Sequence, residues 1–298
     1  MSSHLIKLKT NNSLNSSDFA TIAKLFSPVY IDYIANNQYE EINHIITTYK
    51  KYFEFVDGFS ILEAYNNLYK LLKKNYRNEY VFKNGIYKSL ILFNHKINEC
   101  VVIPEFNVGA SKADLAVFNG TSTVYEIKSE IDSTERLKSQ MGDYENFFEF
   151  LNVVISRKHL SRVKRIIPSN AGIYVLDEKN KINLEREAIS NLQNLTHKTL
   201  FYSLRKPEYL YIIERKFGFV PKIPNTQIFA YCYNLFTNID IQEAHYLVTE
   251  ALKLRQFKDE QIRLIKSLPE SLKCISISKR YNKLKCDNII NNLTILHN

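Results

Sequence analysis

Two apolar runs joined by an Asn-Gly pair constrain the fold of this chain more than any other feature. The runs span residues 113–118 and 121–128, and Asn119 and Gly120 lie between them. An Asn-Gly pair between two such runs is the strongest local signal for a β-hairpin, because both turn positions need a positive φ that Asn and Gly tolerate. The sequence therefore predicts a pair of antiparallel strands to which the neighbouring segments add.

Further strand-like runs and helical patterns surround this hairpin. The strand-like runs are 100–103, 152–156 and 171–176, and the helical patterns are 79–95, 133–150 and 157–166. Strands that alternate with helices favour an α/β fold in which helices cover both faces of the sheet. The resulting order is α-β-β-β-α-β-α-β, and we expect a mixed sheet with helical flanks.

The chain divides by pattern into three consecutive segments. Residues 1–75 form an all-helical pattern, 76–180 form the α/β core, and 181–298 form a mainly helical region. In this last region, helical periodicity predicts helices at 186–197, 205–215, 241–256, 259–268 and 277–293. We expect the chemistry to be confined to the middle segment.

The hairpin carries three charged residues that could form a catalytic site: Asp114, Glu126 and Lys128. Strand residues two apart share a face, so Glu126 and Lys128 point the same way, and the hairpin brings Asp114 beside them. Two carboxylates this close repel each other unless a cation is bound between them. Mg²⁺ prefers such oxygen ligands and lowers the pKa of a bound water, which the lysine can orient. The spacing predicts a metal-dependent phosphodiesterase site, and the alternative is a surface hairpin with an ordinary Glu–Lys pair.

A polar stripe on the next helix supports the phosphodiesterase interpretation. Arg136, Gln140 and Tyr144 are four residues apart, so they lie along one side of the predicted helix 133–150. Such a stripe is unusual for a helix that only packs in a core, and it suits a helix that offers donors to a phosphate. We expect Asp132 or Ser133 to cap this helix, and a cap is favoured over a ligand role for Asp132. Arg136 either clamps a phosphate or pairs with Asp132.

This combination of motifs resembles the PD-(D/E)xK nucleases. Gln140-Met-Gly-Asp-Tyr144 resembles the Q-x-x-x-Y motif of their RecB-like branch. The string E-I-K-S-E-I-D-S-T-E-R-L-K-S-Q-M-G-D-Y, followed by N-V-V-I-S-R-K-H, also resembles a family of small bacterial and phage proteins of unassigned function with the same predicted nuclease core. The resemblance covers residues 76–178 and leaves out both helical flanks. It implies a restriction-endonuclease-like mixed sheet and a nuclease that depends on Mg²⁺ or Mn²⁺.

The resemblance also implies roles for the matching residues. Asp114 and Glu126 are the implied metal ligands, together with the backbone carbonyl of Ile127, and Lys128 is the implied catalytic lysine. The supporting residues of the Q-x-x-x-Y motif are Gln140 and Tyr144.

One more acid is expected at the metal. Related folds often supply it from the first core helix, where Glu79 stands, as a further metal ligand and catalytic residue. The sequence departs from the family pattern at Pro104-Glu105, because this pair lies on the preceding strand and not directly before the motif Asp. Glu105 is therefore a second candidate, and Glu79 is favoured.

The positive charge of the chain fits a nucleic-acid partner. The formal net charge is +9 and the sequence pI is about 9.1, so the chain attracts polyanions. DNA is the favoured partner, and a membrane surface is the competing one. A third alternative is that the charge reflects only a lysine-rich composition and serves no polyanion. The basic runs 157–159, 162–165 and 279–280 are each either a phosphate track or a solvated helix face. His159 either contacts a phosphate or is structural.

We expect a cytoplasmic protein that does not associate with a membrane. No window reaches about 18 uncharged apolar residues, and the first residues lack the apolar run of a signal peptide. The four cysteines do not have the spacing of a zinc site. A homodimer is an open alternative to a monomer, because many related folds act as dimers.

The sequence thus favours a Mg²⁺- or Mn²⁺-dependent nuclease that hydrolyses DNA phosphodiester bonds. The alternative is a catalytically weak nucleic-acid-binding or regulatory protein with a nuclease-like fold, because the similar small phage proteins have no assigned reaction. DNA versus RNA, and cutting at ends versus interior positions, depend on the shape of the entrance and stay open.

Overall fold

The computed structural model describes residues 14–52, 58–91 and 100–297. The chain divides into two compact units: one combines Met1–Lys88 with Lys258–Asn298, and the other is Ser89–Phe257. We call them the helical unit and the sheet unit. The expected boundaries at 75 and 180 do not coincide with these units, because helices after residue 258 share a hydrophobic core with the N-terminal helices.

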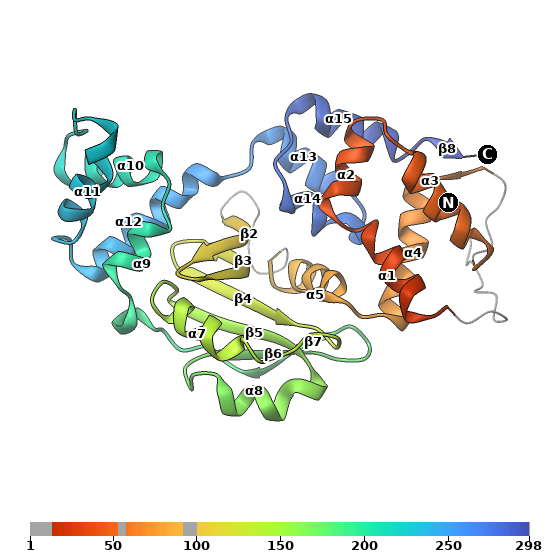
Figure 1. The fold of residues 1–298 in the computed structure, drawn as a ribbon, viewed down its shortest axis with the longest axis horizontal. Coiled ribbons are helices and arrows are strands. Elements are labelled where there is room, and N and C mark those ends of the chain that lie inside the picture. Colours follow the sequence, from red (N-terminus) through yellow and green to blue (C-terminus); the bar gives the residue numbers. More distant parts are fainter. Residues whose placement is uncertain (1–13, 53–57, 92–99, 298) are drawn as a thin grey trace. The chain divides into compact units, whose positions relative to one another are not determined.

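A six-stranded mixed sheet forms the centre of the sheet unit (Figure 1). Its strands are β2 (Val101–Val108), β3 (Ser111–Phe118), β4 (Ser122–Lys128), β5 (Phe150–Ser156), β6 (Gly172–Leu176) and β7 (Ile182–Arg186), in that spatial order. The strands β4, β5 and β6 run parallel, and the other neighbouring pairs are antiparallel. The prediction of a mixed α/β sheet with helical flanks is confirmed.

The predicted hairpin is formed by β3 and β4. Gly120 has a φ of 99°, which residues with a side chain rarely adopt, so glycine suits this turn. The register pairs Leu115 with Tyr125, and continuing it by one residue places Asp114 opposite Glu126. Residues opposite each other in antiparallel strands point to the same face of the sheet. The turn therefore determines which side chains meet at the far end of the hairpin.

Two helices pack on the face of the sheet to which the side chain of Glu126 points. Helices α7 (Leu137–Glu145) and α8 (Leu160–Ile166) bury Met141 and Val163 in the same core as Val124 and Val153 of the strands. The predicted helix 133–150 is thus shorter at both ends. Its start differs because Oδ2 of Asp132 accepts hydrogen bonds from the backbone N and Oγ of Ser129, at 2.7 Å and 2.6 Å, and closes a turn after β4. Asp132 is therefore not the helix cap.

The helix predicted at 186–197 is wrong. The strand β7 occupies its start, and only a short 3₁₀ turn, η4 (Leu192–Asn194), follows. The guanidinium of Arg186 donates to the carbonyls of Ala171 and Pro168, and the buried amide of Asn191 donates to the carbonyls of Glu145 and Phe148. These tertiary hydrogen bonds hold the segment in an extended and irregular conformation that local periodicity does not reveal.

A helical lobe completes the sheet unit. Its helices are α9 (His197–Tyr202), α10 (Lys206–Phe217), α11 (Asn225–Phe236) and α12 (Ile241–Leu252), followed by η5 (Lys253–Arg255). The sequence did not predict α11. The buried carboxylate of Glu208 pairs with Arg255 at 2.6 Å, and Arg255 also lies over the ring of Phe106 on β2, at 5.4 Å from its centroid. The lobe and the sheet therefore share one core.

The helical unit consists of short amphipathic helices and a two-stranded sheet. Before the sheet unit come α1 (Ser16–Lys24), α2 (Pro28–Ala35), α3 (Glu40–Tyr49), η1 (Lys50–Tyr52), β1 (Phe59–Ser60), α4 (Ile61–Asn75) and α5 (Glu79–Ile86). The short helix η2 (Tyr87–Ile91) contains the boundary between the two units. After the sheet unit come α13 (Asp259–Ser267), η6 (Glu270–Leu272), α14 (Ile275–Ser278), α15 (Lys283–Asn292) and β8 (Leu296–His297). The strands β1 and β8 pair and so join the two ends of the unit. Within the described residues, every helix is too short or too polar to cross a lipid bilayer.

Candidate active site

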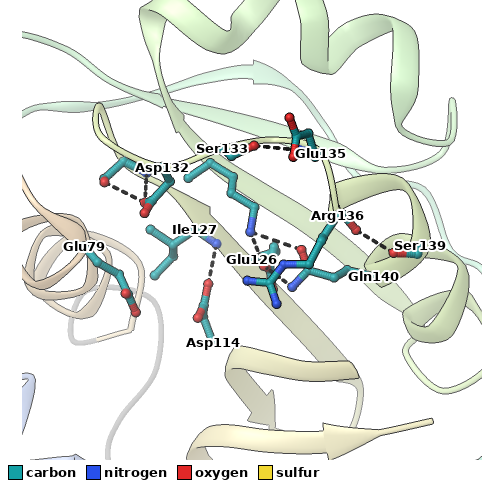
Figure 2. A network of polar contacts seen from close by, with 12 residues as sticks. Glu79, Asp114, Glu126, Ile127, Asp132, Ser133, Glu135, Arg136, Ser139 and Gln140 are labelled. Atoms are coloured by element: carbon teal, nitrogen blue, oxygen red, sulfur yellow. Dashed lines mark hydrogen bonds and ion pairs between the residues drawn. The ribbon is translucent and has the colours of Figure 1, made fainter. Parts of the chain in front are cut away.

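The carboxylate of Glu126 lies at the centre of a hydrogen-bond network (Figure 2). Its Oε1 accepts from Nζ of Lys128 at 2.8 Å and from Nε2 of Gln140 at 2.6 Å. Its Oε2 accepts from the phenol of Tyr144 at 2.8 Å. Nζ of Lys128 also donates to Oε1 of Gln140 at 3.1 Å. Glu126 is 1% exposed and Lys128 is 7% exposed, so the interpretation of a solvent-exposed Glu–Lys pair is wrong.

Two elements bring these four side chains together. The strand β4 supplies Glu126 and Lys128, whose spacing of two places both on the face that α7 covers. The helix α7 supplies Gln140 and Tyr144, which are one turn apart and face the strand. Burying a carboxylate and an ammonium costs several kcal/mol for each ion, and such a pair adds little stability over an apolar one. A buried, hydrogen-bonded Glu–Lys pair at a sheet end is therefore a candidate site of function.

Asp114 is held beside this network by the backbone of β4. Its Oδ2 accepts a hydrogen bond from the backbone N of Ile127 at 2.8 Å, and its side chain is half-buried (Figure 2). In a strand, the N–H and C=O groups of one residue point toward the same neighbouring strand. The carbonyl of Ile127 is thus directed to the side on which Asp114 lies, as its expected role as a ligand requires.

Glu105 lies next to Asp114 within the sheet unit. The register of β2 and β3 pairs Pro104 with Leu115 and Phe106 with Ala113, which leaves Glu105 opposite Asp114. Carboxylate oxygens of Glu105 and Asp114 lie within 4.8 Å of each other. Glu105 also has a φ of 54°, which is uncommon for a residue with a side chain and carries a backbone cost of about 1–3 kcal/mol.

Glu79 belongs to the helical unit. It opens α5, whose N-cap is Asn78, and its Oε1 forms an ion pair with Nζ of Lys83, one turn later, at 2.6 Å. Glu79 thus stabilises the start of α5, because a negative charge interacts favourably with the helix dipole there. The role of Glu79 as an additional acid stays a prediction.

The phenol of Tyr144 remains a neutral donor. Burial raises its pKa well above the ordinary value, and the carboxylates of Glu126 and Asp114 raise it further. Its ring also makes an edge contact with Phe148, at 6.0 Å between centroids. Tyr144 thus keeps its hydroxyl proton and donates it in the hydrogen bond to Glu126.

Other residues that the sequence singled out lie around this network. Arg136 is exposed just before α7, and its side chain points toward Gln140 (Figure 2). In the described part of the chain, Arg136 and Asp132 do not form an ion pair, so that alternative for Arg136 is wrong. Nε2 of His159 hydrogen-bonds to the carbonyl of Ser129 at 2.9 Å, which gives this histidine a structural role.

The oxygen atoms at this end of the sheet suit a hard divalent cation. The described side chains supply Glu126 with three donors, two on Oε1 and one on Oε2, whereas a carboxylate accepts about four. One acceptor position on Oε2 is thus left for an ion. The close carboxylates of Glu105 and Asp114 repel each other, and a shared cation would relieve that repulsion.

Comparisons with known proteins match most of the chain to one family. The profile of the family described as Bacteriophage P4 protein cII matches residues 72–278. Protein cII of Enterobacteria phage P4 is 31% identical over 102 residues, which are 34% of this chain and 36% of that protein. Among solved structures, a protein of unknown function from Silicibacter pomeroyi aligns with 48% of this chain and 94% of its own length, at 14% identity and a TM-score of 0.29. This structural similarity is too low to carry an argument.

Proposed function

This chain belongs to the bacteriophage P4 protein cII family, and we propose that it is a Mg²⁺- or Mn²⁺-dependent nuclease that hydrolyses DNA phosphodiester bonds. The proposed site is the end of β3 and β4 at which Asp114, Glu126 and Lys128 lie. The observation that carries the proposal is the buried network of Glu126 with Lys128, Gln140 and Tyr144. The strand order around it is consistent with a restriction-endonuclease-like core.

The metal ion would be held by oxygen ligands from neighbouring strands. These are the carboxylates of Asp114 and Glu126 and the backbone carbonyl of Ile127, with one more acid from Glu105 or Glu79. When bound, Mg²⁺ or Mn²⁺ polarises a phosphodiester and lowers the pKa of a coordinated water. The hydrogen bond from the N–H of Ile127 fixes the orientation of Asp114 before any ion arrives.

Lys128 supplies positive charge at a fixed position. An ammonium has three N–H donors, and two of them are directed to Glu126 and Gln140. The third is available to a water or to a phosphate oxygen, whose negative charge grows during attack on phosphorus. Gln140 and Tyr144 act through Glu126: they hold its carboxylate in place, so they are positioning residues. Arg136 can neutralise a second phosphate oxygen from the start of α7.

Cleavage assays with matched lysine variants test this proposal. Plasmid and linear DNA would be incubated with the full chain, Mg²⁺ or Mn²⁺, and EDTA as the metal-free arm. Lys128→Met is expected to lower the cleavage rate by about 10²- to 10³-fold, because it removes one preorganised cation. Lys216→Met is the control, since this lysine of α10 is only ion-paired with Glu243, at 2.6 Å. Cleavage that continues in EDTA, or that survives Lys128→Met, contradicts the proposal.

A nucleic-acid-binding protein with little turnover is the second candidate. The observation in its favour is that the ammonium of Lys128 is already engaged by Glu126 and Gln140, so its charge is partly compensated. DNA binding that Asp114→Asn leaves unchanged, without cleavage in any metal, would support this second function.

A further inference from the structure

A dense basic segment follows the strand next to β4. Residues 157–165 read R-K-H-L-S-R-V-K-R, with five lysines or arginines and no acid. The segment begins with η3 (Arg157–His159) and continues as α8. All five cationic residues are exposed. We call residues 157–165 the basic ridge.

The basic ridge is fixed to the end of the strand that carries the proposed site. Lys128 pairs in parallel register with Ile155 of β5, and the ridge begins two residues after Ile155, at Arg157. Nζ of Lys158 donates to the carbonyl of Glu130, and Nε2 of His159 hydrogen-bonds to the carbonyl of Ser129. Ser129 and Glu130 directly follow Lys128 in the chain. The ridge therefore has a defined position beside the proposed catalytic strand.

The ridge has one apolar side, which fixes its orientation. Val163 is fully buried in the core of the sheet unit, and Leu160 and Ile166 pack against that core. Arg162 and Arg165 are three residues apart on α8, so they lie along one outward stripe, and the exposed Lys158 precedes them on η3. At about 1.5–2 Å per residue, the segment from Lys158 to Arg165 is roughly 10 Å long.

Most of the charge on the ridge is not compensated within the protein. Lys164 forms an ion pair with Glu185 at 2.6 Å. Among the residues that the structure describes, Arg157, Arg162 and Arg165 have no carboxylate at ion-pairing distance. Guanidinium groups that are exposed, closely spaced and unpaired repel one another and attract a polyanion.

We propose that the basic ridge binds successive phosphates of a nucleic-acid strand and so guides it to the Glu126–Lys128 site. This inference rests on the proposed function for the identity of the site, but the binding itself does not require cleavage. One strand presents a phosphate about every 3.4 Å along the helix axis, so a segment of roughly 10 Å spans about three phosphates. Lys158, Arg162 and Arg165 are the cations that meet them.

The chemistry of the ridge favours a nucleic acid over a membrane surface. A helix that lies on a membrane combines its basic face with large apolar side chains that enter the lipid. Within 157–165, all of which the structure describes, no large apolar side chain is exposed. A charged stripe without such anchors is suited to a phosphate backbone, which is contacted without burial of apolar groups.

Salt-dependent binding tests the inference without any cleavage. The full chain carrying Lys128→Met would be titrated in EDTA against fluorescently labelled single-stranded and duplex DNA, by anisotropy, at salt concentrations from 50 to 200 mM. Each lost phosphate contact lowers the slope of log K against log[salt] by about 0.7–0.9. Adding Arg162→Gln and Arg165→Gln is therefore expected to lower the slope by about 1.4–1.8.

Two further double variants make the result specific. Arg162→Lys with Arg165→Lys keeps the charge and is expected to keep the slope, which separates charge from packing. Arg215→Gln with Lys216→Gln removes the same charge from exposed positions of α10 and is expected to leave the slope within about 0.5. An unchanged slope for the ridge variant, or an equal loss for the α10 variant, overturns the inference.

Cleavage assays and salt-dependent binding together distinguish a failure of the ridge proposal from a failure of the nuclease proposal. A ridge-dependent slope without cleavage by the unmodified chain keeps the ridge and rejects the nuclease. Cleavage with an unchanged slope keeps the nuclease and rejects the ridge. Ridge-dependent binding to vesicles of anionic phospholipid, without binding to DNA, would assign the ridge to a membrane and also reject the inference.

Discussion

The phenol of Tyr144 donates a 2.8 Å hydrogen bond to Oε2 of Glu126, which lies 18 residues earlier on β4. This bond joins α7 to the sheet through a buried charge. A hydrogen bond to a charged group contributes more to stability than one between neutral groups. Tyr144 should therefore matter for folding as well as for the position of the carboxylate.

Replacing this phenol tests that role. Tyr144→Phe keeps the ring and its contact with Phe148, and it leaves a buried carboxylate oxygen without its donor. We expect the free energy of unfolding to fall by about 1.5–3 kcal/mol. Chemical denaturation with urea, monitored separately for each unfolding transition, measures this change.

Tyr65→Phe is the matched control. The hydroxyl of Tyr65 is also buried but has no hydrogen-bond partner among the described residues. Removing a buried hydroxyl that bonds to nothing should not destabilise the protein and can stabilise it. Equal losses for the two variants would show that the hydrogen bond to Glu126 contributes nothing specific.

The additional acid can be assigned by a pair of charge-neutralising variants. Because Glu105 lies opposite Asp114 within the sheet unit, we expect Glu105→Gln to weaken Mn²⁺ binding at least tenfold, which is about 1.4 kcal/mol. Glu79→Gln makes the same change at the start of α5 and is expected to have less effect. Isothermal titration calorimetry with Mn²⁺ gives both affinities, and the reverse order would assign the acid to Glu79.

The backbone of Glu105 provides a second measurement. Its φ of 54° favours glycine, so Glu105→Gly should raise the free energy of unfolding by about 1 kcal/mol while it weakens Mn²⁺ binding. A residue that costs stability but holds a ligand is expected at a functional site. Lower stability of Glu105→Gly would show that its side chain, and not its backbone, dominates the local energy.

His245 makes the stability of the sheet unit depend on pH. Burial lowers its pKa from 6.5 to about 4, and its Nε2 lies 2.7 Å from Oγ of Ser122. Because Oγ of Ser122 accepts from the backbone N of Glu149 at 2.9 Å, its proton is available to a neutral imidazole. The folded pKa lies below the unfolded value, so protonation favours the unfolded chain.

The contribution of His245 is thus complete above pH 6.5 and is lost as the pH falls toward 4. A shift of this size corresponds to about 3 kcal/mol. Urea unfolding between pH 4 and pH 7 should show this loss in the unmodified chain and a flatter profile in His245→Gln, which has no titrating group there. Parallel profiles for the two proteins would contradict the assignment.

Local signals allowed prediction of the strands that carry the site. The hairpin and the spacing of Glu126 and Lys128 depend on residues close in sequence, and the structure forms both. Of the two residues Asn119 and Gly120, only Gly120 has a positive φ, so the turn differs in detail from the expected one. The helix that carries Gln140 and Tyr144 was predicted for the same reason: residues four apart share a side.

Features that depend on distant contacts were not predictable in this way. The strand β7 is held by hydrogen bonds from Arg186 to carbonyls before β6, and no local pattern encodes them. Asp132 has the residue type of a helix cap, but the backbone of Ser129 competes for its carboxylate. The contact between Lys158 and Glu130 depends on the parallel pairing of β4 with β5 and was likewise not foreseen.

We propose that Asp114 and Glu126 share one metal ion beside Lys128. A crystal structure of the protein soaked in Mn²⁺, with anomalous diffraction data, tests it directly. We predict a single strong anomalous peak about 2.0–2.3 Å from a carboxylate oxygen of both Asp114 and Glu126, and its loss in Asp114→Asn. A structure in which the Mn²⁺ peak is absent from these two carboxylates, while Glu126 keeps its bonds to Lys128 and Gln140, would contradict the claim.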